Sequence, residues 1–235
     1  MTLFISHIHE DIRQSRRTKR GATTAPDKVP RGLHKEYTRM EKIQLPDPMP
    51  VSMTIGETME RRTSYDHGSN QGIIPLETWG TLLGLALKRR EGSHKRNYPS
   101  GGALYPIETY LIGNSIEGSR PAAFHYNPTA HALEKLWDLP SDLNLKDLAP
   151  KPDTLHFSAI IVFTAVWKRS SAKYGDLAYT HGLLEAGHMS ENILLVATAL
   201  SLNTRPMAGF NDGLIATILD LPELEQSVHS IVLST

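Results

Sequence analysis

The spacing of apolar residues along the chain predicts three helices. From Tyr179 to Leu200 apolar residues recur every three or four positions, which predicts the longest helix of the chain. A similar stripe in LETWGTLLGLALKRR, directly after Pro75, predicts a second amphipathic helix. Thr54 is followed three residues later by Glu57, a capping-box spacing that predicts a short helix over GETMERR.

Other segments show the β-branched or alternating patterns of strands. The pattern of residues 107–112 predicts one strand. A hairpin is predicted over residues 122–126 and 132–137, which a polar turn separates. Residues 158–167 are continuously apolar, which predicts a central strand covered on both faces. The pattern of residues 231–233 predicts the last strand.

Strands and helices are mixed without regular βαβ alternation, which indicates an α+β fold. Asp212 is expected to cap a further helix, Gly213–Leu219. Residues 1–50 are polar and interrupted by prolines, so we expect an N-terminal arm there and the main domain over residues 51–235.

Composition narrows the function classes. The 235 residues carry 25 basic and 25 acidic side chains, so no net charge draws the chain to nucleic acid or to an anionic membrane. The absence of cysteine excludes disulfides, thiolate zinc sites and cysteine nucleophiles. No run approaches the ~18 apolar residues of a membrane helix, and the first residues lack the core of a signal peptide. We therefore expect a soluble, cytoplasmic protein.

The stretch RNYPSGGALYPIETYLI, Arg96–Ile112, has a glycine-rich loop leading into a strand. It lacks the dinucleotide and P-loop glycine patterns. Gly101 and Gly102 permit positive φ and allow a flat ligand to approach the backbone. The alternative is a plain turn before the strand.

Three other stretches carry candidate chemistry. Arg61-Arg62-Thr63-Ser64 supplies guanidinium and hydroxyl donors suited to a phosphate, or is a solvated helix end. Lys173 and Tyr174 lie between the apolar strand and the long helix, either as an ordinary surface loop or as a base with a proton donor beside it. Residues 203–210 form a loop of small residues and proline, which either connects two helices or offers backbone donors to a ring edge.

The histidines give no metal site. His7, His9 and Glu10 have a suitable spacing but no third ligand nearby. His181 and His188 fall on one face of the long helix, as packing or interface residues do. GxSxG, HExxH and paired-carboxylate signatures are also missing from the sequence.

Taken in order, these stretches are similar to a known family. NYPSGGALYPIETYLI and KYGDLAYTHGLLEAGHMSENILLVATALSLNTRPMAGF resemble the motifs of the SagB-type dehydrogenase branch of the FMN-dependent nitroreductase superfamily. ERRTS resembles the early arginine–serine phosphate motif of the superfamily, and ISHIHE and HKEYTRMEKIQLPDP resemble its lead-in. The resemblance covers about residues 5–235.

The resemblance implies a nitroreductase-like α+β fold, with a central, mostly antiparallel sheet flanked by helices, in an intertwined homodimer that binds FMN at the subunit interface. The long helix would build the dimer core. Residues expected to hold FMN are Arg61, Arg62, Thr63, Pro99, Ser100, Gly101, Gly102, Tyr105, Glu191, Pro206, Met207, Ala208 and Gly209.

The resemblance also implies a reaction. Characterised members dehydrogenate azolines to azoles in modified peptides, which implies a peptide substrate and a cyclodehydratase partner. Lys173 and Tyr174 match the proposed proton-handling pair. The chain departs from the pattern at Leu177, Glu191 and Ala208, which weakens the specific azoline-oxidase assignment. An NAD(P)H-dependent nitro- or quinone reductase and a non-catalytic flavin-fold binding protein remain the alternatives.

Overall fold

The computed structural model describes residues 12–14, 30–65, 72–113, 116–149 and 157–235. Seven strands form one sheet in the order β1-β4-β3-β2-β5-β7-β6, and every neighbouring pair is antiparallel. This confirms the predicted α+β class and the antiparallel sheet. The strands are β1 (Glu41–Gln44), β2 (Ile107–Gly113), β3 (Ala122–Asn127), β4 (Ala132–Asp138), β5 (Ala159–Val166), β6 (Asn203–Met207) and β7 (Glu225–Ser234).

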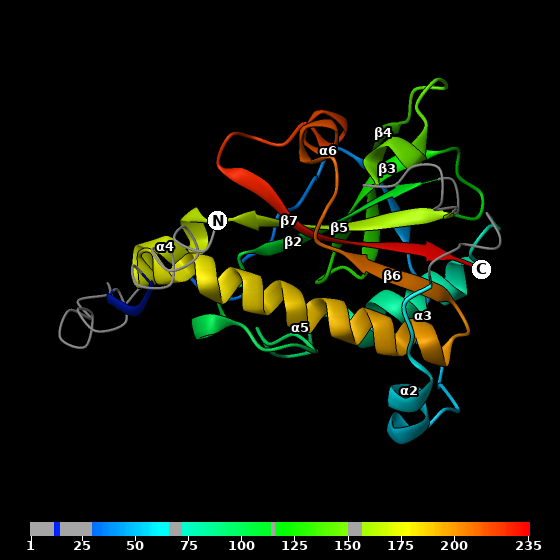
Figure 1. The fold of residues 1–235 in the computed structure, drawn as a ribbon, viewed down its shortest axis with the longest axis horizontal. Coiled ribbons are helices and arrows are strands. Elements are labelled where there is room, and N and C mark those ends of the chain that lie inside the picture. The colour runs from blue at the N-terminus through cyan, green and yellow to red at the C-terminus, as the bar shows by residue number, and fades with distance from the viewer. Residues whose placement is uncertain (1–11, 15–29, 66–71, 114–115, 150–156) are drawn as a thin grey trace, which may run out of the picture.

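Helices cover both faces of this sheet. The long helix α5 runs across one face, with α4 at its beginning and α2 near its other end (Figure 1). The described helices are α2 (Ile55–Arg61), α3 (Leu76–Leu87), α4 (Lys168–Tyr174), α5 (Leu177–Ala199) and α6 (Asp212–Leu219), with short 3-10 helices at Gly101–Ala103 and Leu145–Leu148.

Two apolar clusters hold the layers together. Ile161 and Phe163 of β5 point into the cluster shared with α3 and α5, whereas Ile160 and Val162 point into the cluster shared with α6. Because successive strand residues face opposite sides, a strand buried on both faces has no polar alternation. The prediction of a central, doubly covered strand is confirmed.

Three predictions need correction. Asn211 is the cap of α6, because its side chain accepts from the Leu214 amide at 3.1 Å, and Asp212 is the first helical residue. Lys173 and Tyr174 end a helix, α4, which stops at Gly175 with φ of +53°. Residues 203–207 form edge strand β6 instead of a loop, and an edge position tolerates a proline.

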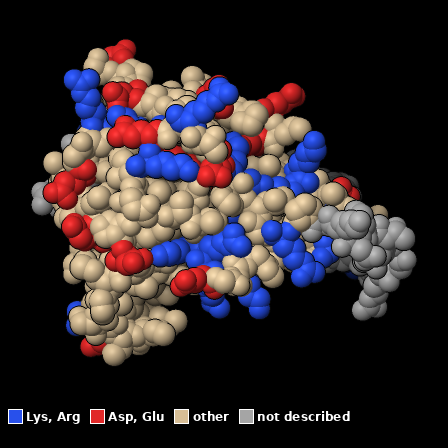
Figure 2. Space-filling view, turned by 180° about the vertical axis from the view of Figure 1, so that it is seen from behind, with Lys and Arg blue, Asp and Glu red and all other residues tan. Residues whose placement is uncertain are grey.

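The sequence also failed to predict β1, which pairs with β4 at the other edge of the sheet. Figure 2 shows that Lys and Arg side chains form a band across the face opposite to the view of Figure 1, with Asp and Glu on either side. Both signs of charge are therefore present on this face. Among the described residues, no helix combines the length and the apolar character needed to cross a membrane.

Candidate functional site

The glycine-rich loop before β2 has an unusual backbone, fixed by hydrogen bonds. Within Pro99–Tyr105, Gly102 has φ of +64° and Tyr105 has φ of +49°. The Tyr105 amide donates to Ser100 Oγ at 2.9 Å, and its hydroxyl accepts from the Arg96 amide at 2.9 Å. A tyrosine rarely adopts positive φ, so these contacts maintain a strained loop shape of the kind found at ligand sites.

Lys173 and Tyr174 meet this loop at Gly102. A Cβ added at Gly102 would lie 2.7 Å from the Tyr174 hydroxyl and 2.9 Å from Lys173 Nζ. The glycine therefore makes room for the ends of these two side chains. Helix α4 positions the pair, since both residues lie in its last turn. The structure thus brings together three of the residues singled out in the sequence.

Two residues of α5 join this cluster, and the sequence did not assign either to the site. A Cβ at Gly101 would lie 3.3 Å from His181 Nδ1, and the His181 ring packs edge-on against Tyr174 with centroids 4.6 Å apart. Glu185 lies one turn further along α5 and is 2% exposed. Burial raises the pKa of the Glu185 carboxyl to about 7, although Ser100 and Arg96 act in the opposite direction.

A pocket of about 200 Å³ lies beside the end of α2. It contains one guanidinium and several hydroxyls, and no carboxylate is among its lining residues, which suits a phosphate group. Arg62 instead ends α2, with its amide donating to the Thr58 carbonyl at 2.9 Å. The lining residues are Met53, Arg61, Thr63, Tyr65, Thr198, Ser201 and Leu202.

Strand β6 runs next to the segment that follows this arginine motif. The Tyr65 amide donates to the Thr204 carbonyl at 3.1 Å, and an Arg205 guanidinium nitrogen lies 3.4 Å from the Tyr65 carbonyl oxygen. The expected ring-edge segment, residues 206–209, continues directly from this contact. Met207 is buried, whereas Ala208 and Gly209 are exposed.

The predicted binding residues therefore fall into two groups at opposite ends of α5, which we name half-sites. The loop half-site contains Gly101, Gly102, Lys173 and Tyr174, and the phosphate half-site contains the pocket at α2 together with β6. His181 and Thr198 are 17 positions apart on α5, which is about 25 Å at the α-helical rise. One FMN molecule is shorter than this distance. Glu191 is exposed on α5 between the half-sites.

A second cavity, of about 390 Å³, opens beside the loop half-site. Its walls combine cationic side chains with the backbone of the glycine-rich loop. The lining residues are Arg90, Lys95, Arg96, Asn97, Tyr98, Pro99, Ser100, Ala103 and Tyr105. Pro99, Ser100 and Tyr105 of the predicted set therefore face one cavity.

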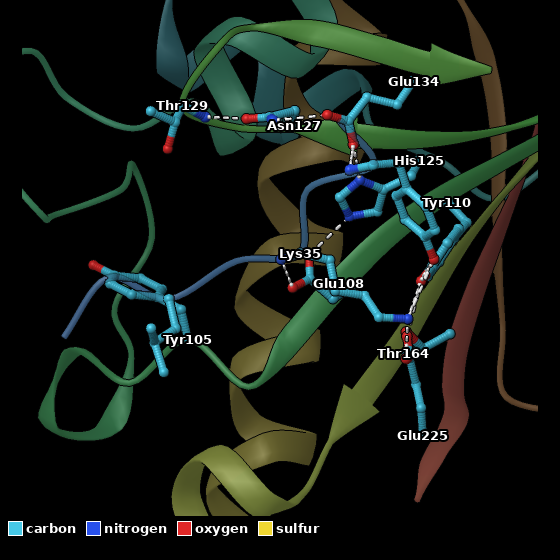
Figure 3. Close-up of polar contacts among 12 residues, drawn as sticks. Lys35, Tyr105, Glu108, Tyr110, His125, Asn127, Thr129, Glu134, Thr164 and Glu225 are labelled. Carbon is cyan, nitrogen blue, oxygen red and sulfur yellow. Dashed lines mark hydrogen bonds and ion pairs between the residues drawn. The ribbon is translucent and has the colours of Figure 1, made fainter. Parts of the chain in front are cut away.

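A buried polar network supports the loop half-site from the sheet (Figure 3). His125 of β3 lies between two carboxylates, 3.0 Å from Glu108 of β2 and 2.8 Å from Glu134 of β4. Burial alone would lower the pKa of His125, but its hydrogen bonds to both carboxylates raise it. The same contacts lower the pKa of Glu108 and of Glu134 despite their burial. We infer a protonated imidazole between two carboxylates.

The network holds the N-terminal arm against the sheet. The Lys35 amide donates to Glu108 at 2.6 Å, and the Tyr37 amide donates to Glu134 at 3.1 Å. The Lys35 ammonium forms an ion pair with buried Glu225 of β7. Residues 35–37 therefore cover polar side chains that an exposed sheet face would leave in water.

The same network reaches α4. Arg169, four residues before Lys173, pairs with Glu108 and donates to the Tyr105 carbonyl at 2.9 Å. One guanidinium thus connects the sheet, the glycine-rich loop and the helix that carries Lys173. This connection fixes where Lys173 lies relative to Gly102.

Two earlier expectations lie outside the described residues: the His7, His9 and Glu10 spacing and the lead-in motif ISHIHE. Among the residues that are described, no group of three or more His, Asp or Glu side chains is arranged to hold a metal ion.

Comparison with known proteins places this geometry in a family. The profile of the nitroreductase family matches residues 58–233. The microcin B17-processing protein McbC of Escherichia coli is 32% identical over 185 residues, which cover 74% of this chain and 66% of McbC. The MJ1384 protein of Methanocaldococcus jannaschii is 27% identical over 183 residues, which cover 77% of this chain and 91% of that protein.

A solved structure agrees with this result. The E. coli microcin synthetase McbBCD complex with truncated pro-MccB17 bound contains a chain that superimposes with a TM-score of 0.66 and 25% identity, over 80% of this chain and 74% of that chain. The resemblance to the nitroreductase superfamily and its fold is confirmed. The chain belongs to the nitroreductase family of oxidoreductases, whose members generally bind FMN.

Proposed function

We propose that this protein is an FMN-dependent dehydrogenase that converts azolines to azoles during maturation of a modified peptide. The observation that carries the proposal is the meeting of Lys173 Nζ and the Tyr174 hydroxyl at Gly102. A lysine side chain and a phenol beside a glycine-rich loop form a proton-handling pair next to the expected ring site. The similarity to McbC, a microcin-processing protein, supports a peptide substrate.

FMN binding requires two copies of the chain in this proposal. The donors of the α2 pocket, Arg61 and Thr63, suit the phosphate, and residues 206–209 follow from the same half-site. The glycine-rich loop lies too far along α5 for one FMN to reach both half-sites. A homodimer with its α5 helices antiparallel brings the loop half-site of one protomer to the phosphate half-site of its partner.

The chain's own residues would handle the proton. When bound, FMN accepts the hydride that leaves the azoline ring. Lys173 as the free amine removes the proton from the adjacent ring carbon, and Tyr174 holds the amine in place and shares its proton. Arg169 fixes both through α4 and the Tyr105 carbonyl. The substrate loses two hydrogens and forms the aromatic azole.

An azoline must first be formed from a serine, threonine or cysteine side chain with loss of water. We therefore propose that the protein works with a cyclodehydratase. The relation to a chain of the McbBCD synthetase complex supports such an assembly.

The test is an anaerobic titration of the FMN-loaded protein with an azoline-containing peptide. The flavin absorbance should bleach without added NAD(P)H. Lys173→Ala should retain the flavin spectrum and bleach at least about a hundredfold more slowly. Lys168→Ala, which removes an exposed lysine at the start of the same helix, is the matched control and should behave as wild type.

Other outcomes support other functions. Rapid bleaching by NADH followed by turnover of a nitroaromatic would favour a reductase. A protein that takes up no FMN, even after reconstitution, would favour a non-catalytic binding role. Normal bleaching of Lys173→Ala would remove Lys173 from the reaction.

A further inference from the structure

Glu185 is a buried carboxyl group that has no role in the proposed reaction. It is 2% exposed; the Ser100 side chain and the Ile107 backbone lower its pKa as hydrogen-bonding neighbours, but neither carboxylate oxygen forms a hydrogen bond of regular length and angle among the described residues. Buried carboxylates are nearly always paired or hydrogen-bonded, because an isolated buried charge is costly. A carboxyl group held this weakly at this depth therefore requires an explanation.

The groups that face Glu185 come from three elements besides α5. The glycine-rich loop contributes Ser100 and Arg96, β2 contributes the Ile107 amide, and α4 contributes Arg169. Arg169 pairs with Glu108, and Arg96 donates to the Tyr98 hydroxyl at 2.7 Å and to a backbone carbonyl.

Because both arginines are engaged with other groups, neither is a dedicated counterion of Glu185. Both arginines lower the pKa of Glu185 by their charge, yet burial outweighs them and sets it near neutrality. The carboxyl therefore exchanges a proton readily at near-neutral pH.

A row of exchangeable groups extends from Glu185 toward the loop half-site. His181 lies one turn before Glu185 on α5, so the two side chains are neighbours on one helix face. The His181 ring contacts Tyr174, and the Tyr174 hydroxyl and Lys173 Nζ border Gly102. Carboxyl, imidazole, phenol and amine thus follow one another from the interior to the site.

We propose that Glu185 accepts, through His181 and Tyr174, the proton that Lys173 removes from the substrate. This inference rests on the proposed function. Lys173 takes the proton of the carbon–hydrogen bond and becomes an ammonium, and the electron pair of that bond stays in the substrate ring; FMN, when bound, would supply the acceptor for the hydride that the ring loses. Passing that proton inward restores the free amine and leaves Glu185 as a carboxylic acid. Glu185 acts through His181 and does not touch the substrate.

The test uses Glu185→Gln, which retains the shape of the side chain and removes its acid. The first measurement is the infrared carbonyl band of a protonated carboxyl in the FMN-free protein, titrated across neutral pH. Wild type should lose this band with a midpoint near neutrality, and Glu185→Gln should lack it. Glu223→Gln, an exposed change before β7, should leave the band intact.

The second measurement is multiple-turnover oxidation of an azoline peptide as a function of pH. Glu185→Gln should bind FMN and peptide normally, turn over about tenfold more slowly or worse, and lose the near-neutral ionisation from its profile. Glu185→Asp retains an acid and should restore that ionisation. If Glu185→Gln fails to fold, His181→Phe should slow turnover while leaving the infrared band of Glu185 in place.

Three results would overturn the inference. A wild-type carboxyl that is fully ionised well below neutral pH has no proton to exchange. A wild-type pH profile in Glu185→Gln would show that the residue is structural. If no azoline peptide reduces the FMN-loaded wild-type protein, the proposed function and this proton route are both overturned. The first two results do not depend on that outcome.

Discussion

Gly102 combines two constraints that a substitution can separate. Its φ of +64° disfavours any side chain, and the ends of Lys173 and Tyr174 fill the place of its Cβ. Gly92 has the same φ of +64° but open space around it. The two glycines therefore form a matched pair.

We predict that Gly102→Ala and Gly92→Ala each lose about 1 kcal/mol of unfolding free energy in urea, since both force alanine into the left-handed region. Only Gly102→Ala should also displace the Lys173 and Tyr174 side chains and abolish azoline oxidation. Equal activity of the two variants would show that the contact at Gly102 does not matter for function.

The raised pKa of Glu185 also makes stability depend on pH. The folded protein holds this proton up to about pH 7, whereas the unfolded chain releases it near 4.5. The contribution of Glu185 is therefore fully favourable below about pH 4.5 and is lost as the pH rises through about 7. At most it amounts to roughly 3 kcal/mol.

The Glu185→Gln variant should not show this loss of unfolding free energy with rising pH. Its stability relative to wild type should rise between about pH 5 and about pH 8, as measured by urea unfolding of the FMN-free protein. Glu223→Gln should follow the wild-type curve. Parallel curves for Glu185→Gln and wild type would contradict the raised pKa.

Among the elements, the N-terminal arm depends on buried charge. Glu134 accepts from His125, from Asn127 at 2.9 Å and from the Tyr37 amide. We predict that Glu134→Gln lowers the unfolding free energy by roughly 2 kcal/mol or more, because His125 loses one of its two carboxylate partners.

The same change should release the arm. Hydrogen exchange at the Tyr37 amide should accelerate in Glu134→Gln, since that amide loses a charged acceptor. Glu36→Gln breaks only an exposed pair with Lys42 and should change stability by less than about 1 kcal/mol. Unchanged exchange at Tyr37 would show that other contacts hold the arm.

At the scale of the elements, the sequence predicts those whose residue pattern is regular over their whole length. Helix α5 and strand β5 were predictable because their apolar spacing repeats along the whole element. Strand β6 was not, because its proline and small residues resemble a loop, and only pairing with β7 makes it a strand. Helix α4 was missed for lack of an apolar stripe.

The residues of the candidate site also divide into those that the sequence predicts and those that it does not. Glycines, arginines and the Lys173–Tyr174 pair stand out in the sequence by their residue types. Glu185 does not, since its burial depends on what packs against α5. Glu108 and His125 are polar residues in alternating strands, which a sequence assigns to a solvated face, whereas the arm covers them here.

At the scale of the whole molecule, α5 presents an apolar face that has no partner within the described part of one chain. Leu184 is 56% exposed and Leu183 is 40% exposed, and a Cβ placed on Gly187 would meet no atom within 4 Å apart from its chain neighbours and the adjacent backbone of its own helix. Leucines beside a small residue allow two helices to pack closely. The proposed homodimer covers this face and completes the FMN site in one step.

We therefore predict that Leu184→Glu makes the protein monomeric in sedimentation and lowers FMN affinity at least about tenfold, because a two-fold contact would bury both new carboxylates. Leu224→Glu changes a leucine that is 65% exposed before β7 and should remain dimeric and bind FMN normally. Azoline oxidation by Leu184→Glu should recover at high protein concentration, since mass action restores the dimer. A Leu184→Glu monomer with wild-type FMN affinity would mean that one chain holds the cofactor alone, and the two half-sites would then have separate functions.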